Sequence, residues 1–403
     1  MPAEIDVPLD AIVTLLVFLI GVPTLVFQSM PPDVRHIFLG RRRLLGYLLV
    51  LIFVPVSSAL VISTVGIYAE ISVAHDAREW AVRWAAVLGV MIAVILVVAI
   101  YFPLRYSRRQ GVLHLLEREA LRRMRSRGRL PEESVEDIID LGKNAESPQE
   151  KGSVLQSIHT LVTETCKHPS YSGDGLETLI LRLHEVVIVD SKPVNLENFR
   201  MVAEIFQEIA IARKEIQHVA DLQRTVKATG SMGRAALARF ESGLEVDNIV
   251  MSFIQTLGLI TYIKPLDVIN KHHFYVMTDV SEALFEIGSL AAEKQRDFIA
   301  VAALDKMITM LSQTPRTEDL PSYIVDELGA DVMGLMAHIW TGGDSQKEFI
   351  LQRLPDVRAS IGMPDAKIFR KARTHYLGKS QFETANRLAQ MEKELKPKPR
   401  RKT

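Results

Sequence analysis

The pattern of hydrophobic and polar positions divides the chain into two parts. The first quarter holds three uncharged apolar runs, 11–29, 44–69 and 85–104, each of at least 19 residues. A helix of about 20 apolar residues is long enough to cross the hydrocarbon core of a bilayer. The pattern therefore predicts a membrane domain over residues 1–104 with three transmembrane helices.

From Pro131 onward, apolar residues recur at helical spacing and short polar breaks separate the segments. Within Asn195–Lys227, apolar residues at intervals of three, four and seven predict one long amphipathic helix. Breaks are expected at 170–174, 229–233, 314–319, 342–344 and 362–365. Val186–Val189 is compatible with a strand but can equally end a helix. We therefore expect an all-α fold, with a multi-helix domain over residues 130–395.

Two segments of this domain resemble each other. Ile138-x-x-Leu141-Gly142 is followed, thirteen residues after its glycine, by a helical pattern starting at Leu155. Leu284-x-x-Ile287-Gly288 is followed at the same interval by a pattern starting at Val301, whereas a third start at 254–258 fits poorly. Each match predicts a helix that closes near its glycine and a second helix that packs back on it. A solenoid-like array of helical hairpins and a set of unrelated hairpins both fit this pattern.

Charged residues around the three apolar runs predict their orientation. The N-terminal flank is acidic and the loop between the second and third runs contains Glu70, Asp76 and Glu79, whereas the loop 31–43 and the segment after the third run are rich in arginine. Because basic loops stay in the cytoplasm, we expect an integral multi-pass protein of the plasma (inner) membrane. Its N-terminus would lie outside and its C-terminal domain in the cytoplasm. The arginines expected to fix this topology and contact anionic headgroups are Arg41, Arg42, Arg43, Arg105, Arg108 and Arg109.

The apolar runs contain small and hydroxyl residues but no ionisable ones, which disfavours a proton relay or an ion-coupled carrier. Small residues at helical spacing allow membrane helices to approach closely. The residues with this spacing are Ala59, Ser63, Ala85, Gly89 and Ala93. Ser57, Ser58 and Thr64 are candidates for lining a pore in an oligomer, although capping of backbone groups near Pro55 is the commoner role of such hydroxyls.

The segment 105–129 combines nine arginines with only two glutamates. Four of the arginines recur at i, i+4, i+7 and i+11 and form one stripe of a helix: Arg118, Arg122, Arg125 and Arg129. A nucleic-acid arm, a lipid-binding strip and a coupling helix are the three interpretations. In an upright helix, only the first arginines would lie within a Debye length of about 8 Å of the headgroups. We therefore favour coupling of the stripe to the acidic body or to a neighbouring subunit.

Overall composition adds few constraints. Lys+Arg and Asp+Glu both number 48, so the net charge of zero implies no polyanionic partner. The basic tail 396–403 is expected to be disordered, and contact with anionic lipid or another acidic surface is the alternative. The single cysteine, Cys166, excludes an intrachain disulfide and a zinc site made of several cysteines.

No motif indicates a catalytic or cofactor site. Thr229–Arg234 is rich in glycine but lacks the lysine and spacing of a Walker loop, so a flexible break between helices is the better interpretation. His159, Cys166 and His168 are close in the chain and His272–His273 are adjacent, but their spacing is not typical of metal ligands. We expect no metal, no cofactor and no enzymatic activity.

These features favour a membrane-anchored interaction or scaffold protein that presents its helical domain to a cytoplasmic protein or to further copies of itself. The expected partners are the bilayer with its anionic headgroups, an unidentified cytoplasmic protein and a homo-oligomer, with nucleic acid the least favoured. The alternative is a homo-oligomeric channel or pore-forming effector gated by the cytoplasmic domain. No constellation of residues supports the third class, an enzyme at the membrane face.

Overall fold

The computed structural model describes residues 27–40, 108–167, 174–188, 195–215, 218–241, 243–261, 271–314 and 322–396, with Gly21, Leu25, Gly46, Ser57 and Val87 as isolated positions. All regular structure in these residues is helical, which confirms the expected all-α fold for this part of the chain. The chain divides into two compact units, 1–119 and 120–403, with the boundary inside one helix.

The predicted membrane localisation needs correction. None of the helices in the described ranges is both long and apolar enough to span a bilayer. Even the apolar α14 (Ser322–Trp340) carries Asp326, Glu327 and Asp331, as expected of a helix that packs against other helices. The predicted spans 11–29, 44–69 and 85–104 lie outside the described residues, apart from Phe27–Ser29 and the isolated positions named above. An integral multi-pass protein is therefore not supported.

The described part of the first unit consists of a short helix, α2 (Pro32–Gly40), and the beginning of α5 (Arg109–Arg127). Arg109 Nε donates a 3.0 Å hydrogen bond to Asp33 Oδ2, and both side chains are largely buried. This ion pair joins α2 to α5.

The second unit contains the end of α5 and twelve further helices along its described residues. They are α6 (Glu132–Asn144), α7 (Pro148–Cys166), α8 (Asp174–Val187), α9 (Leu196–Glu215), α10 (Val219–Arg239), α11 (Leu244–Thr261), α12 (Lys271–Glu293), α13 (Asp297–Gln313), α14, α15 (Asp344–Ile361), α16 (Asp365–Gly378) and α17 (Phe382–Leu395). The segment considered as a strand, Val186–Val189, begins as the last turn of α8, which ends at Val187.

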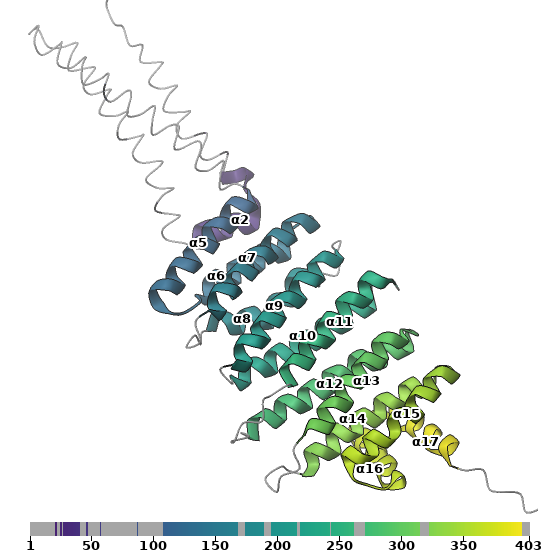
Figure 1. Ribbon diagram of the computed structural model, residues 1–403. Coiled ribbons are helices and arrows are strands. Elements are labelled where there is room, and N and C mark those ends of the chain that lie inside the picture. Colours follow the sequence, from purple (N-terminus) through teal and green to yellow (C-terminus); the bar gives the residue numbers. More distant parts are fainter. Residues whose placement is uncertain are drawn as a thin grey trace, which may run out of the picture. The chain divides into compact units, whose positions relative to one another are not determined.

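These helices pack in two layers, visible as parallel rows in Figure 1. From α6 to α14 each helix contacts its successor in the chain, as α16 contacts α17, and most helices contact the helix two places ahead. The helices α6, α8, α10, α12, α14 and α16 therefore form one layer, and α7, α9, α11, α13 and α15 form the other, while α17 packs on α14 and α16. Next-but-one helices run parallel, because Glu132 pairs with Thr178 at their starts and Asp140 with Arg182 further along.

Local sequence signals explain several helix ends. Ser147 Oγ accepts a hydrogen bond from the backbone N–H of Glu150 at the start of α7, and Pro148 occupies the first helical position. Helix α15 ends at Gly362, whose φ of +70° is the left-handed conformation that favours glycine. The predicted starts at Pro131 and Asn195 and the predicted breaks after 313, 341 and 361 agree with the observed helix bounds.

The predicted long helix and the predicted break that follows it are both wrong in position. Helix α9 ends at Glu215, where the N–H of His218 bonds to the carbonyl of Arg213, and α10 then runs without interruption through Thr229–Gly233. The glycines lie there because α12 approaches closely. A Cβ at Gly230 would stand 2.8 Å from Ala283 Cβ, and one at Gly233 would stand 2.7 Å from Ile287 Cδ1.

A similar close approach explains the two matching segments. Gly142 in α6 faces Val186 of α8 and Val154 of α7, and Gly288 in α12 faces Leu335 of α14 and Ala303 of α13. The two glycines thus occupy corresponding places three hairpins apart. Gly288 lies inside α12 and does not end it, so that part of the prediction is wrong. Gly258 belongs to the other layer, which explains the poor third match.

Candidate functional site

The predicted arginine stripe lies along α5 and the turn that follows it. Arg118, Arg122, Arg125 and Arg129 are all exposed, while Leu113, Leu116, Ala120 and Met124 on the other side of the helix are buried. Arg125 Nη2 lies 3.6 Å from Glu164 Oε2 of α7. The other three form no ion pair with any residue that the structure describes. Coupling by this stripe remains a prediction.

The residues expected at the bilayer are described only in part. Arg108 is exposed and Arg109 is paired with Asp33, with 15% of its side chain exposed. The residues outside the described ranges are Arg41, Arg42, Arg43, Arg105, Ser58, Ala59, Ser63, Thr64, Ala85, Gly89 and Ala93. Ser57 is described only as an exposed helical residue. Headgroup contact, close packing of membrane helices and a pore remain untested.

The glycine-rich motif Thr229–Arg234 lies in the middle of α10, where backbone N–H groups are bonded within the helix. Thr229 is buried and its hydroxyl donates to the carbonyl of Thr225 at 2.6 Å. Arg234 Nη1 lies 3.2 Å from Glu286 Oε2 of α12. The motif therefore serves contact between α10 and α12, and it lacks the free helix N-terminus that holds an anion.

The histidines and the cysteine do not come together in the described part of the chain. His159 Nε2 lies 3.2 Å from Glu208 Oε2, and His168 lies outside the described residues, as do the side chains of His272 and His273. Burial raises the pKa of the half-buried Cys166 thiol to about 11. No group of His, Cys, Asp or Glu side chains in the described ranges could hold a metal ion.

A buried polar cluster that the sequence reasoning missed lies between α12, α14 and α16. Its centre is Asp331 on α14, which is 3% exposed. Tyr376 Oη donates to Asp331 Oδ1 at 3.3 Å, and His375 Nε2 lies 3.7 Å from the same oxygen. Burial raises the pKa of Asp331 to about 7, opposed by the positive charge of Lys379. A buried carboxyl is easier to keep neutral than charged.

The ring of Tyr376 occupies the space next to Gly334, where a Cβ would overlap its hydroxyl and ring atoms. The ring centroid of Phe285 on α12 lies 5.4 Å away at an interplanar angle of 32°. Burial, followed by the charge of Asp331, raises the pKa of Tyr376 well above its ordinary value. The tyrosine is thus enclosed by α12 and α14 and stays protonated.

Acidic side chains of α12 and α14 surround this centre. Glu282 and Glu327 share Lys379, the residue after α16, with an Nζ–Oε1 distance of 3.7 Å to each. Burial raises the pKa of Asp279 and of Glu286. The negative charges of Glu327 and Glu282 add to the preference of Asp331 for its neutral form.

A second buried group, His338 near the end of α14, binds α17. Its Nε2 lies 3.0 Å from Thr384 Oγ1, and its ring packs edge-on against Phe285 with centroids 5.8 Å apart. Burial lowers the pKa of His338 to about 4, so the ring is neutral at ordinary pH. Chemically, the cluster can hold and release a proton, but Asp331 and Tyr376 are too enclosed to meet a substrate.

One signal in the sequence points to this cluster. Asp331 is the only carboxylate between Leu328 and Trp340, in a run that is otherwise apolar or small except for His338. All ten residues from Asp331 to Trp340 are buried. A helical segment that is buried on every side has to enclose any carboxylate it carries.

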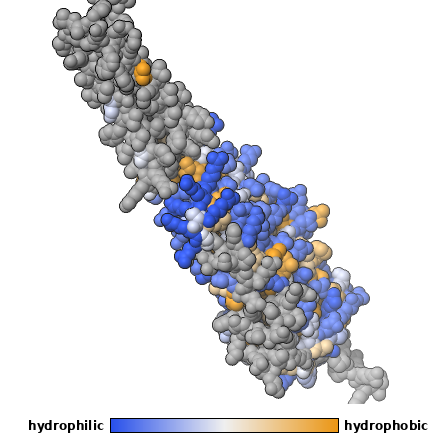
Figure 2. All heavy atoms as spheres, turned by 60° about the vertical axis from the view of Figure 1, so that its left-hand side comes forward, coloured by the Kyte–Doolittle hydropathy of each residue, from blue (hydrophilic) through white to orange (hydrophobic). Residues whose placement is uncertain are grey.

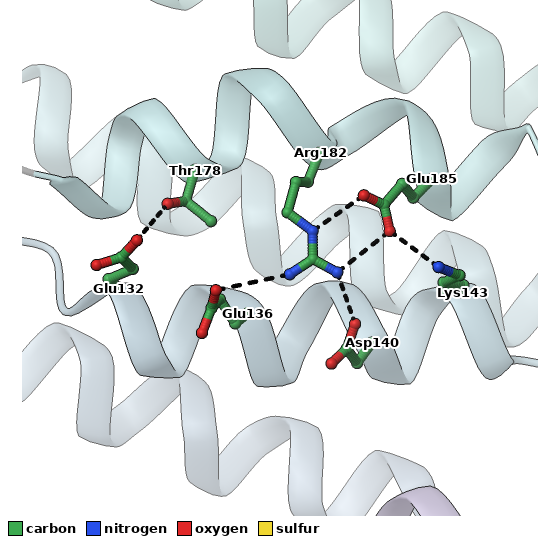
Figure 3. A network of polar contacts seen from close by, with 7 residues as sticks. All are labelled: Glu132, Glu136, Asp140, Lys143, Thr178, Arg182 and Glu185. Carbon is green, nitrogen blue, oxygen red and sulfur yellow. Dashed lines mark hydrogen bonds and ion pairs between the residues drawn. The ribbon is translucent and has the colours of Figure 1, made fainter.

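A contrasting polar network joins α6 to α8 at the other end of the layer (Figure 3). The guanidinium of Arg182 lies 2.9 Å from Asp140 and 3.0 Å from Glu185, and Glu185 is also 3.1 Å from Lys143 Nζ. Hydrogen bonds from Arg182, followed by those from Lys143, lower the pKa of Glu185 to about 2. The charged side chains of this network, Arg182, Asp140, Glu185 and Lys143, are partly exposed, and each pairs with a side chain of opposite charge.

The comparisons with known proteins identify no relative: no protein-family model, curated protein or solved structure matches this chain.

Proposed function

We propose that the chain is an interaction or scaffold protein whose tandem helical hairpins bind a protein partner or a second copy of the chain. The observation that carries this proposal is the packing of next-but-one helices in two layers from α6 to α16. In such an array each hairpin contacts only its neighbours, so the surface grows with every hairpin and suits an extended partner.

The character of the surface also supports binding to a protein. Figure 2 shows one face on which hydrophilic side chains dominate and apolar patches are small and separate. Exposed large apolar side chains occur in both layers, for example Leu181 on α8, Tyr323 on α14, Leu259 on α11 and Phe298 on α13. Mixed surfaces of this kind are typical of interfaces that form and dissociate, rather than of permanent ones.

The buried polar groups favour structural roles over catalytic ones. The Cys166 thiol is protonated at neutral pH because burial raises its pKa, so it is a poor nucleophile. Asp331 and Tyr376 pair with each other inside the helix stack. The expected lack of enzymatic activity remains a prediction.

A photo-crosslinking experiment on the full-length chain tests the proposal. A photoreactive amino acid placed at Leu181 or Leu259, which are 51% and 37% exposed, should yield discrete adducts with one protein or with a second copy. The same amino acid at Phe298 maps the second layer further. Light scattering over a range of concentrations then separates self-association from binding of a different protein.

The matched control carries the photoreactive group at Leu179, which is fully buried in α8. It should give no adduct with another chain. The proposed function would be wrong if light scattering shows a monomer at every concentration and photo-crosslinking gives the same weak, non-specific products from exposed and buried positions.

A further inference from the structure

The last part of α5 and the turn after it carry a surplus of positive charge. Between Ala120 and Pro131 the chain has five arginines and no acidic residue. Four of them are exposed: Arg122, Arg125, Arg127 and Arg129. Together with Lys167 after α7, these four residues are called the basic end below.

Nearby carboxylates do not neutralise this charge. Arg123 lies 3.7 Å from Glu133, and Arg125 lies 3.6 Å from Glu164. Glu164 is held more closely by Lys167, at 2.5 Å, and that lysine is the main cause of its lowered pKa. Glu133 and Glu164 thus pair with three of the six cations, namely Arg123, Arg125 and Lys167. Arg122, Arg127 and Arg129 form no ion pair with any residue in the described ranges.

The helix ends are arranged so that these side chains share one region. Met124 of α5 accepts a hydrogen bond on its sulfur from Thr165 of α7 at 3.3 Å, so the last turns of the two helices are in contact. Gly128 ends α5 with a φ of +63°, and no atom lies within 4 Å of the place where its Cβ would stand. Arg127 and Arg129 therefore flank an open turn.

Cations in other parts of the array are used differently. Arg182, Arg224, Arg353 and Lys371 each pair with a carboxylate of a neighbouring helix at 3.0 Å or less. These pairs connect successive helices of a layer. The arginines of the basic end, apart from the long contact of Arg125, contribute nothing of this kind.

The helix dipole explains only part of the surplus. Cations in the last turn of a helix are favoured by its partial negative charge, an effect that fades within one turn. It applies to Arg125 and Arg127, whereas Arg122 lies earlier in α5 and Arg129 lies beyond it. The dipole therefore leaves Arg122 and Arg129 unexplained.

We propose that the basic end binds a carboxylate-rich segment of a protein partner, a proposal that rests on the function proposed above. Arginine forks match carboxylates in paired hydrogen bonds, and three exposed arginines on this short stretch, Arg122, Arg127 and Arg129, form no ion pair with any residue in the described ranges. No aromatic residue occurs between Arg108 and Pro131, so the region offers no platform on which nucleic-acid bases could stack.

The test measures binding of a fluorescein-labelled glutamate-rich peptide to the full-length chain by fluorescence anisotropy. The variant R122Q/R125Q/R127Q/R129Q should bind at least about tenfold more weakly, and added salt should weaken wild-type binding. Circular dichroism verifies that the variant keeps its helices. A matched control, R200Q/R239Q/R358Q/R370Q, removes the same charge from exposed positions elsewhere and should bind like the wild type.

Equal binding by the variant and the wild type, or an equal loss in the control, would overturn the proposal. Tighter binding of an oligonucleotide than of the peptide at the same ionic strength would also overturn it, in favour of a nucleic-acid site. If the peptide fails to bind while photo-crosslinking at Leu181 or Leu259 still yields discrete adducts, the proposal for the basic end is wrong and the proposed scaffold function stands.

Discussion

The contact between α6 and α8, called the seam below, and the contact between α14 and α16, called the joint, have the same helix packing. They differ in how their carboxylates are held. At the seam, Arg182 collects Asp140 and Glu185 in partly exposed ion pairs. At the joint, Asp331 is buried and bonds to a neutral phenol. The pKa of Glu185 falls to about 2, whereas that of Asp331 rises to about 7. One fold thus holds its parallel helices together in two ways that respond to pH in opposite directions.

The difference shows that the burial of a carboxylate within the helix stack decides whether it is held charged or neutral. Helices α6 and α8 leave one side open to solvent, so charge is tolerated and each ion pair stabilises the fold only slightly. Helix α14 is covered by α12, α13, α15, α16 and α17, so a charge there would be costly. The four predictions below test this contrast, from the largest expected effect to the smallest.

Replacing Tyr376 by Ala should have the largest effect. It leaves a cavity beside Gly334 and Phe285 and removes the hydrogen-bond donor of Asp331, which should cost about 3–5 kcal/mol of unfolding free energy. Tyr376→Phe removes only the hydroxyl and should cost about 1–2 kcal/mol. Urea unfolding monitored by circular dichroism measures both. Equal stability of wild type and Tyr376→Ala would show that the joint carries little energy.

The stability of the joint should fall as pH rises. Between the ordinary pKa of 3.8 and about 7, folded Asp331 holds a proton that the unfolded chain has released, so its contribution declines across this window and is lost above it. The expected change is about 2–4 kcal/mol. The groups facing Asp331 are Ser281, Glu282, Glu327, His375, Tyr376 and Lys379.

Hydrogen exchange of α14–α17, measured by mass spectrometry below and above pH 7, follows this change after correction for the intrinsic exchange rate. Asp331→Asn keeps a polar side chain without a titrating proton and should flatten the profile. At the seam, Glu185 should act in the opposite sense. Its contribution is present above its ordinary pKa of 4.5 and is lost as pH falls towards 2. An identical profile in Asp331→Asn and wild type would assign the pH dependence to another group.

Adding a methyl group at matched glycines should separate the two regions again. Gly334→Ala displaces the Tyr376 ring and its bond to Asp331, and should cost about 2–3 kcal/mol. Gly142→Ala requires only small shifts of Val186 and Val154, which lie 2.8 and 2.9 Å from the added atom, and should cost about 1 kcal/mol. Thermal unfolding of the two variants compares them directly, and a larger loss for Gly142→Ala would reverse the expected order.

Arg182→Gln should have the smallest effect. The ion pairs of Arg182 are partly exposed, so the loss should be below about 1 kcal/mol and should shrink as salt is added. Urea unfolding at low and high ionic strength provides the measurement. A large loss that does not depend on salt would mean that Arg182 acts by packing rather than by charge.

The sequence allowed the all-α class and several helix starts to be predicted, because these depend on local spacing. Glycine was harder to interpret. Gly230 and Gly233 suggested a break in the helix. In the structure they allow the close approach of α12, whose facing residues Ala283 and Ile287 lie much further along the chain. The Asp331 joint was missed for the same reason, since its burial depends on α12 and α16. Long apolar runs suggested a membrane protein, a localisation that the helices of the described residues do not support.

The parallel stacking of next-but-one helices has a consequence for how the chain assembles. Partners across a layer, such as Asp140 with Arg182 and Asp331 with Tyr376, are 42 and 45 residues apart, so each hairpin can dock as soon as the next one has been synthesised. The enclosure of Asp331 must wait for α16, which arrives near the end. Folding of this array should therefore finish with the uptake of a proton by Asp331, and this last step should be slower above about pH 7 than in mildly acidic solution.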